Sequence, residues 1–320
     1  MALLARHPNP PARSRAGLRA GAAVVPGSAA LSLLLLGHAQ VPDVAGMGLL
    51  LDSGLIWLGA AIPALGLLAL AARRKRVAVV VLVPALVWAF MFVPGMVPLA
   101  WSVPHTAGTP MTVASQNLQA GSGTAAESAE TLADSGAQVV ALQEIAGTAR
   151  DSVAAELGAR YEYSYQVGTV GLWSSYPILN ARPEGLGLGW NRALSADLAT
   201  PAGTVRIYVV HAASARPADH AERDTMLTSL ARAIAADPSK RIVAVGDFNA
   251  ASTDRHFAPL LDLLAEPRQD AGLAGFTWPA SPFPVTRLDH VLQRGMSATS
   301  NTVLRAGAGD HLALRTSFTL

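Results

Sequence analysis

Four short polar signatures lie in the last two-thirds of the chain, each at or soon after an apolar run. They are Gln143-Glu144, Gly246-Asp247-Phe248-Asn249, Asp289-His290 and Gly309-Asp310-His311. The clearest runs, 139–142 and 242–245, are short and rich in Val and Ala or Ile, which is typical of buried strands. Polar residues at the ends of such strands are expected to converge at one edge of a sheet. Carboxylates, amides and imidazoles gathered in one place are the groups that metal-assisted phosphate chemistry needs.

The elements that must position these residues occupy one region, 111–320, which is long enough for one large α/β domain. The sequence pattern predicts helices at 124–135 and 218–236. Many strands with few helices indicate two packed sheets with helices outside. Strands are predicted at 111–118, 139–142, 163–167, 171–174, 193–198, 205–211, 241–245, 288–292, 298–304 and 312–318.

Seven short motifs in this region occur together in a fixed order. From Thr112 to Leu320 the chain resembles the endonuclease/exonuclease/phosphatase superfamily, which has the DNase I-like fold. The resemblance implies a four-layer α/β sandwich and cleavage of a phosphate ester or anhydride that depends on Mg²⁺, with Mn²⁺ as a second option. The motifs end at Asn117, Glu144, Pro177, His211, Asn249, His290 and His311.

Metal binding is assigned by this resemblance to three residues. Glu144 is expected to be the principal Mg²⁺ ligand, with Asp310 and Asn117 beside it. Mg²⁺ takes few protein carboxylates and keeps several waters, so this small set is sufficient. The alternatives are a solvated acid after a strand for Glu144 and a turn residue for Asn117.

The Gly246-Asp247-Phe248-Asn249 motif is the most specific short match. Asp247 and Asn249 are two positions apart, so on an extended backbone their side chains point the same way. Asp247 is the candidate general base or water-orienting group, and Asn249 is the candidate donor to the phosphoryl oxygens. The alternative is an Asx-turn at the end of a strand.

Two histidines complete the expected catalytic set. The resemblance implies that His311 donates to a non-bridging phosphoryl oxygen and that Asp289 holds its imidazole in place. His211 matches the other catalytic histidine of the family, although it could also be an ordinary polar residue at a strand end. His290 is expected to point away from Asp289 and to be structural.

The first third of the chain has the composition of a membrane region. Hydrophobic residues make up 51% of the chain and charged residues 14%, against about 25% charged residues in soluble domains. Apolar stretches at about 20–37, 49–72 and 77–99 each reach the roughly 20 residues that span ~30 Å of hydrocarbon. Asp52 would be costly in a membrane, so it is expected at the interface. The chain contains no cysteine, which excludes disulfides and thiolate chemistry.

Charges between the apolar stretches predict a multi-pass protein of the cell membrane. Residues 1–19 and the loop at 73–76 are basic, so both are expected on the cytoplasmic side. A linker at 104–110 and a catalytic domain at 111–320 then lie outside the cell. A cleaved signal peptide and a soluble helical domain are the alternatives, but neither accounts for the long second and third stretches.

The substrate must be inferred from context, because this fold serves several chemistries. The region 111–320 has Lys240 as its single lysine and no basic cluster, so nucleic acid is the less favoured partner. A domain tethered to a bilayer meets lipid head groups at high effective concentration. The whole arrangement resembles VanJ-type membrane phosphatases linked to teicoplanin resistance, which implies a polyprenyl pyrophosphate of the cell wall as substrate. A tethered nuclease, a phospholipase C-like phosphodiesterase and a non-catalytic membrane sensor are the alternatives, and no protein partner is inferred.

Overall fold

The computed structural model describes residues 15–72, 75–102 and 108–320, and the chain divides into two units. The first unit holds residues up to 40 and residues 55–93, and the second holds residues 41–54 and 94–320. Most of the basic N-terminus, Arg73 and Arg74, and most of the predicted linker lie outside the described residues.

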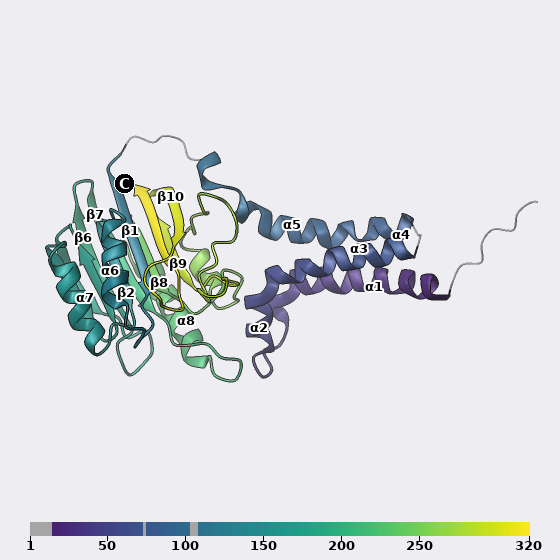
Figure 1. The fold of residues 1–320 in the computed structure, drawn as a ribbon, viewed down its shortest axis with the longest axis horizontal. Coiled ribbons are helices and arrows are strands. Elements are labelled where there is room, and N and C mark those ends of the chain that lie inside the picture. The colour runs from purple at the N-terminus through teal and green to yellow at the C-terminus, as the bar shows by residue number, and fades with distance from the viewer. Residues whose placement is uncertain (1–14, 73–74, 103–107) are drawn as a thin grey trace, which may run out of the picture. The chain divides into compact units, whose positions relative to one another are not determined.

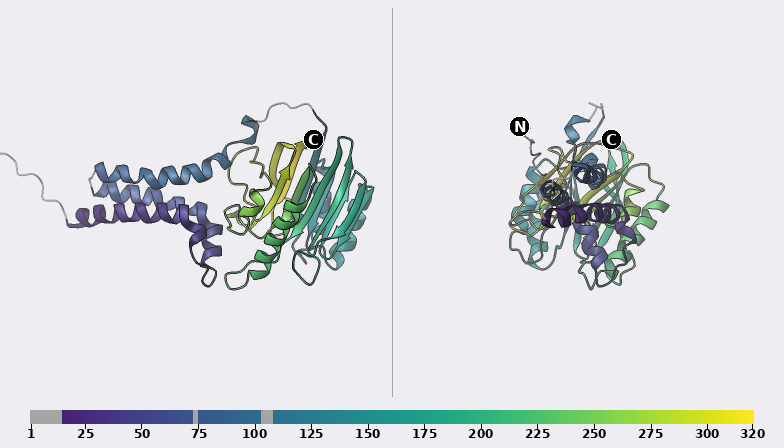
Figure 2. Two further views of the ribbon diagram at one scale, coloured as in Figure 1. Left: turned by 180° about the vertical axis from the view of Figure 1, so that it is seen from behind. Right: turned by 90° about the vertical axis from the view of Figure 1, so that its right-hand side faces the viewer.

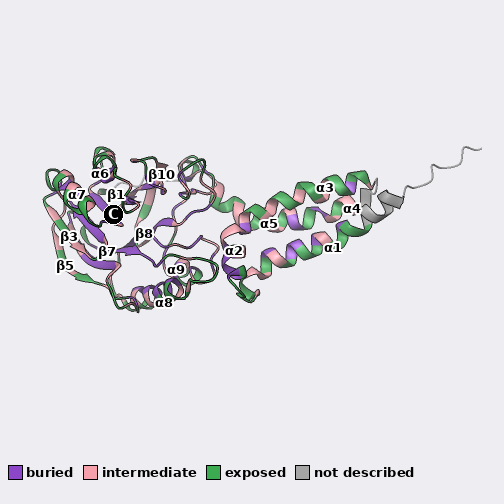
Figure 3. Ribbon diagram, turned by 60° about the horizontal axis from the view of Figure 1, so that its bottom comes forward, coloured by how far each residue is buried: buried purple, intermediate pink, exposed green. Residues whose placement is uncertain are grey.

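The first unit consists of apolar helices. Together with α2 (Met47–Gly54) of the second unit they form three stretches, 22–40, 47–71 and 77–96, that are long and apolar enough to cross a membrane, and just 11 to 22% of the residues in each apolar stretch are buried. Figure 3 accordingly shows these helices mainly as exposed and intermediate surface. Apolar side chains that protein does not cover favour lipid over water, which supports a membrane protein. The helices are α1 (Arg15–Gly37), α3 (Ala61–Ala71), α4 (Lys75–Val80) and α5 (Leu82–Met96), with short 3₁₀ turns η1 (His38–Gln40) and η2 (Leu55–Ala60).

The second apolar stretch is not a single α-helix, and its first part, which contains Asp52, belongs to the second unit. Helix α2 (Met47–Gly54) belongs to the second unit, and η2 separates it from α3. Asp52 is buried there, with Oδ2 2.7 Å from Nε of Arg255. The expected position of Asp52 at the membrane interface stays a prediction. The partner that allows burial lies 203 residues away, too far for any local pattern to indicate it.

The second unit contains two β-sheets, which can be followed in Figure 1 and from two further directions in Figure 2. The six-stranded sheet has the order β10-β11-β1-β2-β4-β3, and the five-stranded sheet has the order β5-β6-β7-β8-β9. The strands are β1 (Pro110–Asn117), β2 (Val139–Gln143), β3 (Tyr163–Val167), β4 (Val170–Ser174), β5 (Ile178–Pro183), β6 (Ala193–Thr200), β7 (Gly203–His211), β8 (Ile242–Asp247), β9 (Asp289–Arg294), β10 (Ser297–Leu304) and β11 (Ala313–Thr319).

Helices cover the outer face of each sheet and complete a four-layer α/β sandwich. Helices α6 (Ala125–Asp134) and α7 (Thr148–Gly158) pack on β1, β2 and β4, whereas α8 (Ala221–Ala236) and α9 (Ala258–Leu261) pack on β7, β8 and β9. A third cluster fills the space between the sheets. Helix α8 buries one face because its apolar residues recur at helical spacing, which the sequence predicted. The predicted fold class is confirmed.

Three elements of the second unit were not predicted. Helix α7 buries just Val153 and Leu157, so its apolar pattern is weak. Strand β5 is an edge strand with a register shift, it contains Asn180 at positive φ, and it ends at Pro183. Proline and a positive φ favour a loop in any local reading, and the pairing with β6 overrides that preference. Helix α9 has just four residues.

Candidate active site

Three neighbouring strands of the five-stranded sheet end with polar residues at matched positions. His211 at the end of β7 is the register partner of Asp247 at the end of β8, and Asp247 is the register partner of Asp289 at the start of β9. Strands β7 and β8 are parallel, and β9 is antiparallel to β8. All three side chains are buried. Sheet register therefore brings together residues that lie up to 78 positions apart, as the sequence predicted.

The six-stranded sheet delivers a second pair of residues to the same place. Asn117 ends β1 opposite Gln143 of the parallel strand β2, and Glu144 follows at once. Asn117 Nδ2 donates to Glu144 Oε1 at 3.0 Å and to Asp247 Oδ2 at 3.0 Å. One amide therefore joins carboxylates from the two sheets. His211 Nε2 lies 3.6 Å from Glu144 Oε1, which closes the cluster.

Glu144 has the left-handed backbone conformation, with φ of 59°. This conformation is uncommon for a residue other than glycine and concentrates at functional sites. The backbone N–H of Ala120 donates to Glu144 Oε2 at 2.7 Å, so both carboxylate oxygens are fixed. The side chain is about 29% exposed, which leaves it accessible to a ligand.

Asp247 and Asn249 meet through a turn, and this corrects the expected extended backbone. Asn249 has φ of 47°, and its backbone N–H donates to Asp247 Oδ1 at 2.8 Å. Its Nδ2 lies 3.2 Å from Asp247 Oδ2. Asp247 and Asn249 thus form an Asx-turn and belong to the candidate site at the same time, so the turn is not an alternative to a functional role. Gly246 enables it, because a Cβ there would lie 2.0 Å from the carbonyl oxygen of Val210.

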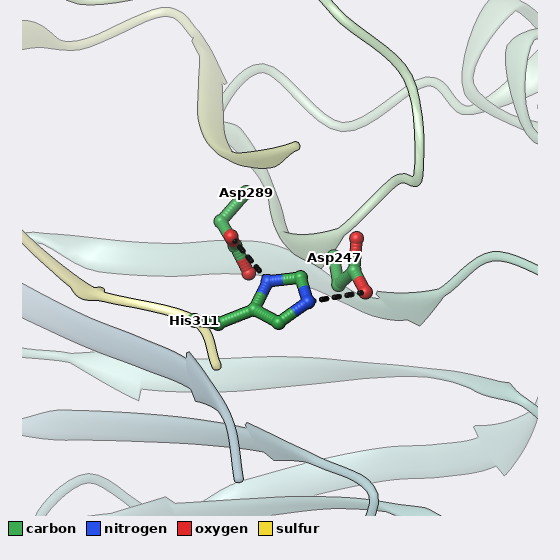
Figure 4. A group of neighbouring side chains, drawn as sticks. All are labelled: Asp247, Asp289 and His311. Carbon is green, nitrogen blue, oxygen red and sulfur yellow. Dashed lines mark hydrogen bonds and ion pairs between the residues drawn. The ribbon is translucent and has the colours of Figure 1, made fainter. Parts of the chain in front are cut away.

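His311 and Asp289 form the pair that the sequence predicted (Figure 4). His311 Nδ1 lies 2.8 Å from Asp289 Oδ2, and its Nε2 faces Asp247 Oδ2 at 3.9 Å. Gln116 fixes the loop that carries the imidazole, because its Nε2 donates to the carbonyl oxygens of Ala306 and His311 at 2.8 and 3.1 Å. The carboxylate of Asp289 therefore orients the ring, and its other nitrogen faces the acidic cluster.

Burial and charge set the protonation states of this group. Burial works against protonation of His311, but the carboxylates of Asp289, Asp247 and Asp310 outweigh it and raise the pKa of His311 to about 10. Burial raises the pKa of Asp247 to about 6, and the positive charge of His311 opposes that shift. At neutral pH His311 is thus a charged donor, and Asp247 is mostly an ionised acceptor with a pKa suited to proton transfer.

In the metal-free protein, His311 is expected to stay charged from neutral pH up to about pH 10. A folded-state pKa near 10 lies above the ordinary value of 6.5, so the ion pair stabilises the fold fully below pH 6.5 and loses this contribution as the pH rises through about 10. NMR titration of ¹⁵N-labelled histidine should show this midpoint, and Asp289→Asn should lower it. A wild-type midpoint near 6.5 would contradict the pairing.

Arg192, which the resemblance places near the cleft of the family without a defined role, is a member of the cluster. Its Nε donates to the carbonyl oxygen of His211 at 2.9 Å, and its Nη2 lies 2.6 Å from His211 Nε2. Burial, followed by the positive charges of Arg192 and His311, holds the pKa of His211 well below its usual range. His211 is therefore neutral. Arg192 lies just before β6, the strand that pairs with β7, and this places it beside His211.

The predicted metal ligands are placed differently from one another. Asn117 points its Nδ2 at two carboxylates, while its Oδ1 accepts from the backbone N–H of Gln119 at 3.0 Å. Asp310 directly precedes His311 in the chain. Its carboxylate has no hydrogen bond or ion pair within the described part of the chain. Metal binding by both residues stays a prediction.

The donor set of the cluster fits a divalent cation. Ligand atoms of Asp247, Asp289 and His311 lie within 4.8 Å of one another. His311 Nδ1 is already engaged by Asp289, so the carboxylates are the better ligands. The buried Oδ1 of Asp289 has no hydrogen-bond partner in the described residues. The carboxylate of Glu144 adds further oxygen atoms, because the Asn117 amide binds both Glu144 and Asp247. Oxygen-rich sites of this kind favour Mg²⁺ or Mn²⁺.

His290, the neighbour of Asp289, is structural, as predicted. It is fully buried on the opposite side of β9 from the cluster, with Nε2 2.8 Å from the carbonyl oxygen of Ala250 and Nδ1 against Glu266. Its ring also packs against Phe257, with ring centroids 4.4 Å apart.

Two packed sheets that bring carboxylate, amide and imidazole groups to a shared edge define a phosphoester hydrolase of the α/β sandwich class. The model of the endonuclease/exonuclease/phosphatase family matches residues 114–311. The chain belongs to this family. A search of curated proteins by sequence gave no match.

Solved structures of similar fold each cover about two thirds of this chain. A family protein from Bacteroides thetaiotaomicron has a TM-score of 0.57 at 14% identity over 67% of this chain and 99% of its own. Beta toxin from Staphylococcus aureus has 0.52 at 14% over 64% and 99%, and D. rerio TDP2, solved with a single-strand DNA product, has 0.52 at 15% over 66% and 100%. Identities this low show a shared fold alone.

Proposed function

We propose that this protein is a membrane-anchored, Mg²⁺-dependent phosphatase that acts on a lipid-linked pyrophosphate. The meeting of Glu144, Asp247 and His311 at one edge of two sheets carries the hydrolase part of the proposal. The three apolar helices on the same chain carry the lipid part. We infer a polyprenyl pyrophosphate carrier of cell-wall synthesis as substrate, an activity that could contribute to glycopeptide resistance.

The proposed chemistry assigns one task to each group. Asp247 accepts hydrogen bonds from Asn117 and from the backbone and side chain of Asn249, which leaves acceptor capacity for one water. Asp247 orients that water and takes its proton. His311 and Asn249 donate to the phosphoryl oxygens as negative charge grows. Glu144 and Asp310 would hold the cation, which supplies charge neutralisation at the phosphate.

Aromatic side chains beside the site support a substrate with an apolar part. Trp190 is exposed and stacks on the guanidinium of Arg192 at 4.6 Å, next to His211. Exposed Trp278 and Phe283 lie on the loop whose Ala280 N–H donates to the carbonyl oxygen of Asp310 at 2.7 Å. Apolar groups thus lie near both histidines. A nucleic-acid groove would instead need basic residues along its length.

The orientation of the chain is part of this proposal. The basic N-terminus and the basic loop at 73–76 favour the cytoplasm, so three crossings leave the catalytic unit outside. Because the chain has no cysteine, a single cysteine placed at exposed Asp262 should react with a membrane-impermeant maleimide in intact cells. Labelling that requires lysis would contradict an exterior substrate.

The purified full chain in detergent should release phosphate from farnesyl or undecaprenyl pyrophosphate when Mg²⁺ is present. Plasmid DNA and phospholipid, offered in parallel, should remain intact, and Asp247→Asn should remove the phosphate release. Nicked plasmid would support a tethered nuclease, and released phospholipid head groups would support a phospholipase C-like enzyme. Metal binding without turnover of any of the three would support a sensor. The full chain is needed because residues 41–54 belong to the catalytic unit.

A further inference from the structure

The segment Val41–Gly54, which connects two apolar helices, is built into the catalytic unit through charged contacts. Asp43 Oδ2 lies 3.0 Å from His220 Nε2, and His220 Nδ1 lies 2.8 Å from Asp224 Oδ2. His220 is the residue that precedes α8, and it lines a cavity of about 370 Å³ together with Asp43 and Asp224. One imidazole therefore joins the segment to helix α8.

Arg223 continues this connection toward the active site. Its side chain is 1% exposed, and its Nε donates to Asp224 Oδ1 at 2.7 Å. Its Nη1 donates to the backbone carbonyl oxygen of Asn249 at 3.1 Å and to buried Asp254 Oδ2 at 2.6 Å. A planar guanidinium can hold several acceptors in a fixed geometry, which a lysine cannot. Arg223 thus fixes both the backbone of Asn249 and the loop that follows it.

The same loop is also held directly by the segment. Thr253 Oγ1 donates to the carbonyl oxygen of Asp52 at 2.6 Å, and the backbone N–H of Arg255 donates to Asp52 Oδ2 at 3.1 Å. The turn at Asn249, with its positive φ, is therefore supported by Arg223 from one side, and the loop that follows it is held by Asp52, which lies outside the predicted catalytic domain. Strained turns persist only where surrounding contacts determine them.

We propose that Arg223 is a positioning residue for Asn249 and that Val41–Gly54 sets this position through Asp43, His220 and Asp224. We call Asp43, His220, Asp224 and Arg223 the support chain. The proposal rests on the hydrolase function proposed above, because Asn249 acts there as a donor to the phosphoryl group. The segment between the first two apolar helices then helps to position an active-site residue. A catalytic fragment that lacks it has a displaced Asn249.

The test uses the full chain in detergent and begins at the far end of the support chain. His220→Gln removes the imidazole that joins the carboxylates of Asp43 and Asp224, and it does not touch the site. We expect kcat on farnesyl pyrophosphate to fall about tenfold with KM nearly unchanged, because Asn249 acts in the transition state. Hydrogen exchange of the peptide 247–256 should accelerate. Asp219→Asn is the matched control, since Asp219 lines the same cavity and its side chain has no contact with the support chain among the described residues.

Two further variants separate positioning from folding. Arg223→Ala would leave the buried Asp254 without its partner. Arg223→Lys is used instead, because it keeps the positive charge but loses the planar guanidinium that holds several acceptors at once. It should lower kcat while KM and the unfolding midpoint stay near wild type.

The double variant Asp43→Asn/His220→Gln should lower kcat no more than His220→Gln alone, because both substitutions break the same connection. Wild-type exchange of 247–256 in His220→Gln, or additive losses in the double variant, would overturn the proposal. The exchange experiment gives its answer even if no phosphate substrate is turned over, in which case the proposed function fails separately.

Discussion

Replacing Asp247 by Asn is expected to lower kcat by about a thousandfold or more, because the variant loses the carboxylate that orients and deprotonates water. The change keeps the shape of the side chain. It leaves an amide N–H₂ where Asp247 Oδ2 accepts from Asn117 and Asn249, at a cost of about 1–3 kcal/mol in stability. Phosphate release under saturating substrate and metal measures the effect, and near-UV circular dichroism checks the fold.

Asp262→Asn is the matched control for this experiment, because Asp262 is exposed at the C-cap of α9 and the exchange of side chains is the same. It should keep wild-type turnover. If Asp247→Asn retained turnover within about threefold of wild type, Asp247 could not be the group that activates water, since that role contributes at least a hundredfold.

Replacing Glu144 by Ala should raise the Mg²⁺ concentration needed for half-maximal activity by about a hundredfold, or abolish saturation altogether. Loss of groups that merely orient a metal ligand already costs about 10–100-fold in affinity, and Glu144 is expected to contact the ion itself. The buried Asn117 amide also loses one of its two acceptors. Metal titration of activity, together with Mn²⁺ binding followed by electron paramagnetic resonance, measures the change.

Glu127→Ala, on the exposed face of α6, is the control and should leave the metal titration unchanged. A wild-type titration in Glu144→Ala would remove Glu144 from the metal site. The acidic cluster of Asp247 and Asp289 would then be the remaining candidate for the cation.

Much of the catalytic unit was predictable because its signals are local. The runs at 139–142 and 242–245 are buried strands, and the polar residues that follow them are the residues of the site. Parallel and antiparallel neighbours in a sheet bring strand ends together, so His211, Asp247 and Asp289 could be expected to meet. Their number and order along the chain then carried the resemblance to the family, which the match over residues 114–311 confirms.

Contacts between distant segments were not predictable. Arg192 could be placed near the cleft by resemblance but given no partner, and the fold sets it against His211. Arg223 looks like an ordinary surface cation in the sequence, yet the fold buries it against Asp254. The apolar stretch at about 49–72 suggested one continuous helix, because hydropathy does not show which partner a carboxylate such as Asp52 will contact.

The sequence by itself determined the types and order of the candidate catalytic side chains, most strands of the two sheets and the apolar helices. These depend on periodicity, strand ends and composition, which are properties of neighbouring residues. Only the tertiary structure decided that Asp52 is buried with Arg255, and that residues 41–54 belong to the catalytic unit. A buried charge is stable only beside a partner of opposite charge, and that partner lies 203 residues further along the chain.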